Sequence, residues 1–200
     1  MANPIEFYFE FASPYGYLAS TQTDALAARH GRTTLWHPIM LGAAFKETGA
    51  RPLTETPLKG PYLLHDVPRF ARLLGVPLRL PPVMPMNSLA ASRACLWLEE
   101  ADPAQARPLA RALLHAHWGE GRDLSLPEAV AEVAAGLAID RGALLAAVAD
   151  QRIKDRLKDQ TQAAIERGVF GSPFIFVDGE PFWGADRLAQ IEAWLARGGW

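Results

Sequence analysis

Strand-forming patterns occur at the two ends of this chain, and the long stretch between them is typical of helices. Between residues 5 and 11, the apolar side chains alternate with more polar ones, which is the period of two expected of a strand. Pro14 then opens a helical pattern that reaches Gly31, and residues 32–39 are rich in β-branched and aromatic side chains. The opening is therefore predicted to be βαβ, with two parallel strands.

The C-terminal end returns to strands. Residues 174–177 and 180–183 flank the turn dipeptide Asp178-Gly179, which predicts a β-hairpin, and a closing helix is expected from about Ala185. Pro181 lacks a backbone N–H, so its strand belongs at a sheet edge.

The middle of the chain, from about Leu41 to Arg167, carries helical patterns separated by proline-rich loops. The expected helices are 62–75, 88–101, 104–118, 127–138, 141–150 and 152–167. The order βαβ, helical block, ββα predicts an α/β fold: a thioredoxin-like domain with a large all-helical insertion. We expect the thioredoxin-like domain to comprise residues 1–43 and 166–200, with 44–165 as the inserted domain.

Composition narrows the class of function. With 20 Lys and Arg against 22 Asp and Glu, the chain has no basic run typical of nucleic-acid binding, and no segment looks like a signal peptide or membrane span. We expect a cytoplasmic protein with no membrane or nucleic-acid partner. The single cysteine, Cys95, cannot form an internal disulfide or a CxxC pair. No metal site is expected, because His115 and His117 point to different faces of a helix.

Ser13 lies where the first strand ends and the first helix begins. Serine there is often a simple helix N-cap. In a thioredoxin-like enzyme, however, the reactive group occupies this joint, and Ser13-Pro14-Tyr15-Gly16 stands where such enzymes carry CxxC. Gly16 in place of the second cysteine excludes a disulfide oxidoreductase.

Two motifs, "FYFEFASPYGYLA" and "GVFGSPFIFVDGEPFWGADRL", resemble those of the 2-hydroxychromene-2-carboxylate isomerase and kappa-class glutathione transferase family, a DsbA-like branch of thioredoxin folds. The resemblance implies a homodimer that binds glutathione. It implies that Ser13 is catalytic and hydrogen-bonds the glutathione sulfur, with Pro14 and Tyr15 beside it. Bound glutathione would then supply the thiol that this chain lacks at position 13.

The second motif implies the remaining glutathione contacts. Ser172-Pro173 is expected to be cis, with the Ser172 backbone pairing with the cysteinyl part of glutathione; the alternative is an ordinary trans proline. Asp186, beside Ala185, is expected to bind the ammonium of the γ-glutamyl end; helix capping is the alternative.

The candidate substrate-binding residues are indicated by less specific sequence signals. Lys46, Arg51 and Lys59 could hold a substrate carboxylate, or could be solvated surface charges. Met86, with Phe45, Tyr62 and Met84, could line an aryl site, or could be core. In the family that this chain resembles, an asparagine that contacts glutathione or substrate often stands where this chain has Ala50.

The expected activity is isomerisation of an aromatic keto acid: interconversion of a hydroxychromene carboxylate and a trans-hydroxybenzylidenepyruvate through a glutathione thiolate. Two alternatives stay open, a kappa-class-like transferase or peroxidase and a non-catalytic binding module.

Overall fold

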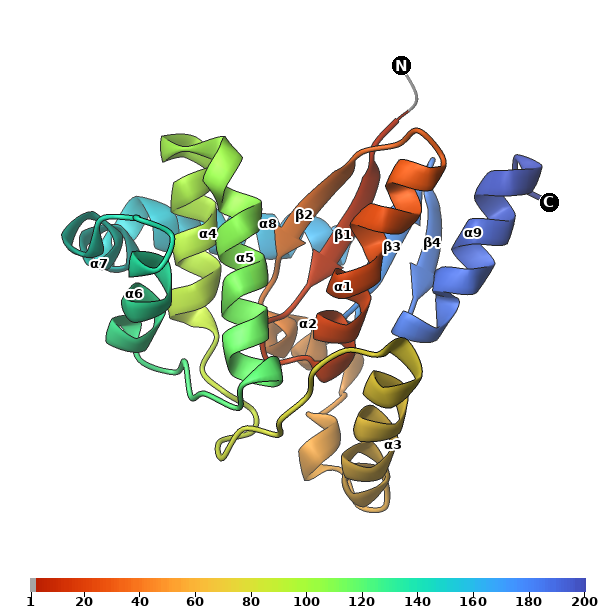
Figure 1. The fold of residues 1–200 in the computed structure, drawn as a ribbon, viewed down its shortest axis with the longest axis horizontal. Helices are drawn as coiled ribbons and strands as arrows, with labels where there is room; N and C mark the ends of the chain where they lie inside the picture. Colours follow the sequence, from red (N-terminus) through yellow and green to blue (C-terminus); the bar gives the residue numbers. More distant parts are fainter. Residues whose placement is uncertain (1–2) are drawn as a thin grey trace.

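The structure is a computed structural model that describes residues 3–200, and its centre is a four-stranded sheet of order β2-β1-β3-β4 (Figure 1). Strand β1 (Ile5–Phe9) runs parallel to β2 (Thr34–Pro38). It runs antiparallel to β3 (Phe174–Val177), which pairs in turn with antiparallel β4 (Glu180–Trp183). The predicted βαβ opening and closing hairpin are therefore confirmed.

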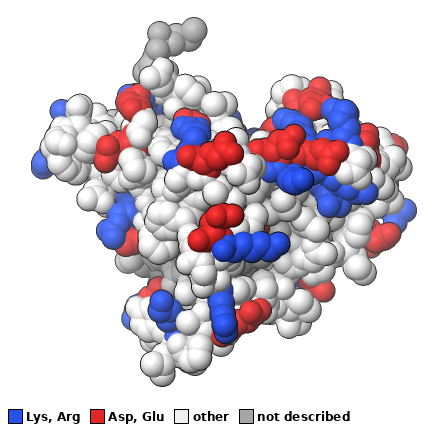
Figure 2. All heavy atoms as spheres, turned by 180° about the vertical axis from the view of Figure 1, so that it is seen from behind, with Lys and Arg blue, Asp and Glu red and all other residues white. Residues whose placement is uncertain are grey.

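Helices cover both faces of this sheet. Helices α1 (Pro14–Arg29) and α9 (Leu188–Arg197) lie in front of it in Figure 1, and α8 (Gln151–Glu166) lies behind. A short 3-10 helix, η3 (Ala185–Arg187), precedes α9. Acidic and basic side chains are interspersed on the rear face of the molecule (Figure 2). Pro181 lies on the edge strand β4, as predicted, because there its missing N–H costs no ladder bond.

The segment between β2 and β3 is helical throughout its regular elements. Besides α8, it contains α2 (Leu41–Thr48), η1 (Leu53–Glu55), α3 (Lys59–Leu74), α4 (Leu89–Ala101), α5 (Pro103–Leu114), η2 (His115–Gly119), α6 (Pro127–Ala135) and α7 (Arg141–Ala149). In residues 3–200, no helix is long and apolar enough to cross a membrane.

Several of these elements differ from the sequence-based expectation, and α6 ends at Ala135 rather than at residue 138. Helix α2 was not predicted as a helix, and α3 begins at Lys59 rather than at residue 62. The predicted helix 104–118 is α-helical only to Leu114 and continues as the π-helical turn η2. The wider turn is tied by hydrogen bonds from Glu120 N–H to the His115 carbonyl and from Arg122 N–H to the Ala116 carbonyl.

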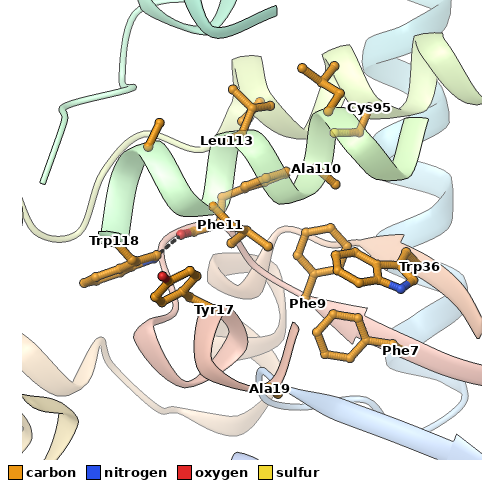
Figure 3. Packing of buried hydrophobic residues seen from close by; sticks show 14 of the residues in the cluster. Phe7, Phe9, Phe11, Tyr17, Ala19, Trp36, Cys95, Ala110, Leu113 and Trp118 are labelled. Carbon is orange, nitrogen blue, oxygen red and sulfur yellow. Dashed lines mark hydrogen bonds between the residues drawn. The ribbon is translucent and has the colours of Figure 1, made fainter. Parts of the chain in front are cut away.

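A continuous apolar core joins the sheet to the inserted helices (Figure 3). Phe7, Phe9 and Trp36 pack edge to face or stacked in the sheet. From the helical block, Leu113 belongs to the same cluster, and Trp118 lies beside Phe11 and Tyr17. The helical block and the sheet therefore share one core, which fixes the first residues of α1 against both.

Candidate active site

Ser13 is the N-cap of α1, and its hydroxyl group also faces a second loop. Its backbone is extended, with φ −97° and ψ 113°, and Oγ accepts a hydrogen bond of 3.0 Å from the Gly16 N–H. The same hydroxyl donates to the carbonyl oxygen of Ser172 at 2.9 Å. Capping is therefore part of what Ser13 does, and the hydroxyl proton is directed toward the loop that precedes β3.

That loop contains the Ser172-Pro173 peptide bond, which is cis, as predicted. Ser172 Oγ accepts a hydrogen bond of 2.9 Å from the Glu10 N–H, and the Glu10 carbonyl accepts one of 3.0 Å from the Ser13 N–H. The cis-proline loop and the start of α1 are thus held together although they are more than 150 residues apart in sequence.

Gly16 allows this close approach. A Cβ atom at position 16 would lie 2.8 Å from Ser172 Oγ and 3.2 Å from the Ser13 Cβ atom. The first contact is too short for carbon and the second is tight, so a side chain here would displace Ser172 Oγ, which accepts the hydrogen bond from the Glu10 N–H.

Glu10 is a buried carboxylate at this site that the sequence analysis did not single out. Only 6% of its surface is exposed. Its Oε2 accepts a hydrogen bond of 3.0 Å from the Leu41 N–H at the start of α2. Burial raises the pKa of Glu10, and hydrogen bonds from the Ser88 hydroxyl and the Leu41 amide oppose this rise. Within residues 3–200 it makes no ion pair, so neutral donors alone compensate its charge. In sequence it looks like an ordinary polar position of a strand, so no local signal marks it.

Tyr15 turns its hydroxyl group away from the serine toward α3. It donates a hydrogen bond of 2.7 Å to Asp66 Oδ2, and Tyr62 and Arg69 contact the other carboxylate oxygen. Burial and the Asp66 carboxylate both raise the pKa of Tyr15. This cluster attaches α3 to the first turn of α1, which Pro14 opens.

Asp186 lies on η3 beside the cis-proline loop. The Gly184 N–H donates to the Pro173 carbonyl at 3.1 Å, which places the turn holding Asp186 next to that loop. The Asp186 side chain is 64% exposed and lies 3.4 Å from the guanidinium of its neighbour Arg187; within residues 3–200 it forms no capping hydrogen bond. Helix capping therefore does not explain Asp186, whereas the adjoining Ala185 is buried.

In residues 3–200, the predicted substrate-binding residues form no hydrogen bond to Ser13 or to the cis-proline loop. Lys46, Arg51 and Lys59 are exposed and make no ion pair within residues 3–200. Met86 is 5% exposed and packs in the apolar core.

The two histidines on η2 do not form a metal site. His117 is fully buried, with Nδ1 2.8 Å from the Arg122 carbonyl oxygen, whereas His115 is exposed near Glu120. No cluster of potential metal ligands occurs in the described chain, residues 3–200. Cys95 is buried, and burial raises the pKa of its thiol well above its ordinary value, so it does not supply a reactive thiolate.

A mixed four-stranded sheet, a polar residue capping the first helix opposite a cis-proline, and a helical insertion before β3 define a thioredoxin-like protein of the DsbA type. Residues 4–196 match the family described as DSBA-like thioredoxin domain. The chain belongs to this family, within the branch of 2-hydroxychromene-2-carboxylate isomerases and kappa-class glutathione transferases.

The similarity covers nearly the whole chain. A 2-hydroxychromene-2-carboxylate isomerase of Pseudomonas putida is 34% identical over 96% of this chain and 94% of its own length. A solved 2-hydroxychromene-2-carboxylate isomerase structure, 33% identical, superposes with a TM-score of 0.88 over 96% of this chain and 94% of the other. Glutathione S-transferase kappa 1 of Caenorhabditis elegans is 26% identical over 94% of this chain and 88% of its own length. These relatives are isomerases and transferases, which indicates an enzyme.

Proposed function

We propose that this protein is a glutathione-dependent isomerase that interconverts a hydroxychromene carboxylate and a trans-hydroxybenzylidenepyruvate. The observation that carries the proposal is the Ser13 hydroxyl group at the positive end of α1, hydrogen-bonded to the cis-proline loop, in a chain whose own cysteine is buried. The similarity to isomerases over nearly the whole of both chains supports it.

The residues present fit glutathione. Ser13 and the exposed Asp186 carboxylate lie on segments that are each hydrogen-bonded to the cis-proline loop, so one small peptide could contact both. An exposed carboxylate without a strong partner is a suitable acceptor for an ammonium group. When bound, glutathione supplies a thiolate, the nucleophile needed for reversible addition to a conjugated double bond.

Ser13 holds this sulfur as its anion. The Ser13 hydroxyl group donates to the Ser172 carbonyl; a thiolate is a stronger hydrogen-bond acceptor than a carbonyl, so Ser13 would donate to the sulfur instead. The Ser172 carbonyl is then free to accept an amide N–H of the peptide. The dipole of α1 favours the same negative charge. Ser13 does not attack substrate, because within residues 3–200 no histidine hydrogen-bonds its hydroxyl group to act as a base.

The reaction is tested by supplying either isomer with and without glutathione. Interconversion should require glutathione while the free thiol concentration stays constant. A falling thiol concentration would instead indicate a kappa-class-like transferase or peroxidase. If a calorimetric titration gives no heat and the melting temperature does not shift, the protein is a binding module of another kind.

Asp186 provides a separate test of the glutathione site. We expect Asp186→Ala to weaken glutathione binding roughly tenfold, as loss of one charged hydrogen bond would, while turnover at saturating glutathione is retained. Glu180→Ala, which removes an exposed carboxylate from β4, is the matched control and should leave the calorimetric dissociation constant unchanged. Equal constants for Asp186→Ala and wild type would show the assignment to be wrong.

Several narrower statements stay predictions. These are the homodimer, the cytoplasmic location, the carboxylate-binding role of Lys46, Arg51 or Lys59, and the contact of Met86 with an aryl substrate.

A further inference from the structure

A cavity of about 330 Å³ lies between the edge strand β2 and helices α4, α5 and α8. Phe9 and Trp36 line it from the sheet, with ring centroids 5.5 Å apart at a steep angle, and Ala106 and Ala110 line it from α5. Its volume falls in the range of small-molecule sites. None of the residues of the candidate active site, such as Ser13, lines it.

Polar groups stand along the open edge of β2 in this cavity. Arg107 donates to the Thr34 carbonyl at 2.8 Å and Gln160 donates to the Pro38 carbonyl at 2.7 Å. In the parallel pairing of β2 with β1, the Thr33 carbonyl and the Ile39 N–H form hydrogen bonds with β1. In a parallel ladder every second residue faces the same neighbour, so the alternate residues between Thr33 and Ile39 also bond to β1. This pairing therefore turns the N–H and C=O of Trp36 toward the cavity.

The charges around the cavity are unequal. Arg107 and Arg111 share one carboxylate, that of Asp24, at 3.4 and 2.5 Å. On the opposite side, arginines and glutamates pair in equal number: Arg152 and Arg156 with Glu99 and Glu100. One guanidinium charge on the α5 side is therefore in excess. Arg107 both lines the cavity and is 42% exposed at its side chain, so it can receive an anion from solvent.

We propose that this cavity is a second binding site, for a small aromatic carboxylate. The ring would pack between Trp36 and Ala106, which keep a small exposed surface in the cavity, whereas Phe9 is fully buried behind Trp36. An edge-to-face contact with Trp36 favours an aromatic ligand. The carboxylate would meet Arg107, whose planar guanidinium suits a two-pronged contact. The site is independent of the proposed function, because binding here needs neither glutathione nor turnover.

Benzoate and the neutral benzamide form a matched pair of probes. The Trp36 indole N–H donates to Asp24 Oδ1 at 2.9 Å, and Asp24 also binds Arg107, so an anion at Arg107 should move the Trp36 indole resonance. We expect a saturable shift with benzoate in the nuclear magnetic resonance spectrum, with the resonance assigned by Trp36→Phe. Benzamide should bind at least tenfold more weakly.

Two substitutions locate the site. Arg107→Gln should weaken benzoate binding at least tenfold, whereas Arg72→Gln, which removes an exposed charge from α3, should not change it. Ala110→Phe should fill the cavity and abolish the shift. If this variant fails to fold, the comparison of Arg107→Gln with Arg72→Gln still tests the proposal. Saturating glutathione should not displace benzoate. The proposal is overturned if benzoate leaves Trp36 unmoved, if Arg107→Gln binds it as well as wild type, or if glutathione competes with it.

Discussion

At Ser13, one hydroxyl group accepts a hydrogen bond from the helix it caps and donates another to the cis-proline loop. The capping and catalytic interpretations are therefore compatible, because they use different parts of the hydroxyl group. The accepted bond fixes the position of Oγ, and the donated bond, now to the Ser172 carbonyl, can turn to a bound sulfur without breaking the cap. A residue in this position can stabilise an anion without any change in the helix behind it.

Gly16→Ala tests how closely α1 and the cis-proline loop must approach. The added Cβ would lie 2.8 Å from Ser172 Oγ, so we expect a loss of roughly 1–3 kcal/mol in the free energy of unfolding, with weaker glutathione binding. Gly42→Ala is the control, because a Cβ there meets no atom within 4 Å; it should be neutral or slightly stabilising. Urea unfolding measures both, and equal effects would contradict the packing argument.

Glu10→Gln tests the buried carboxylate through the pH dependence of stability. Burial raises the folded-state pKa of Glu10 above its ordinary value of 4.5, so the unfolded chain releases this proton first as pH rises. The contribution of Glu10 to stability is thus complete below that value and is lost as pH increases through the folded-state pKa. Gln cannot ionise.

The stability difference between Glu10→Gln and wild type should therefore move in favour of the variant from about pH 4 to neutral pH. Urea unfolding at a series of pH values measures it. A difference that stays constant with pH would show that the folded-state pKa of Glu10 is not raised.

At the scale of elements, the strands were predictable and several helix boundaries were not. Alternation in residues 5–9 and the Asp178-Gly179 turn are local signals, and both gave the observed strands. Helix α2 is short, and packing against α8 and a hydrogen bond from Leu41 to Glu10 support it, which no local pattern reveals. The same holds for η2, where the Arg79 N–H donates to the Trp118 carbonyl at 2.7 Å from a distant segment, in addition to the local hydrogen bonds of the wider turn.

Trp118 shows what η2 contributes. Its indole Nε1 donates to the Phe11 carbonyl at 2.8 Å, two residues before Ser13, and the side chain is 2% exposed (Figure 3). Trp118→Phe would leave this buried carbonyl unpaired, so we expect a loss of about 1–3 kcal/mol in the free energy of unfolding. Trp183→Phe, at a 55% exposed position, should cost about 0.5 kcal/mol or less. Thermal unfolding that shows equal losses would contradict this role.

For the whole molecule, the order of strand and helix signals was enough to predict a thioredoxin-like sheet with a helical insertion, and that prediction is confirmed. The boundaries of the insertion at 44 and 165 stay a prediction. Helix α8 shows why they are difficult to draw: it belongs to the inserted segment in sequence, yet Ala164 packs with Tyr8 and Phe176 on the rear of the sheet.

Residues of the candidate site could be predicted from the sequence only where they belong to a recognisable motif. Ser13, Ser172-Pro173 and Asp186 were singled out from sequence motifs, and the structure places them around one loop. Their roles toward glutathione stay predictions. Glu10 was missed because its burial depends on α2 and on Ser88, which reach it only in the folded chain.

Ser13 is proposed to keep the sulfur of bound glutathione in its anionic form. The most direct measurement is the ultraviolet absorbance of the thiolate against pH, for glutathione bound to wild type, Ser13→Ala and Ser13→Thr, with turnover rates measured alongside. A hydrogen bond to a charged group contributes on the order of 1.5–3 kcal/mol, so Ser13→Ala should raise the pKa of bound glutathione by about 1–2 units. It should slow turnover roughly ten- to a hundred-fold. Ser13→Thr, which keeps the hydroxyl group, should retain most of the effect. Equal pKa values and equal rates for wild type and Ser13→Ala would contradict the account and leave Ser13 as a helix cap.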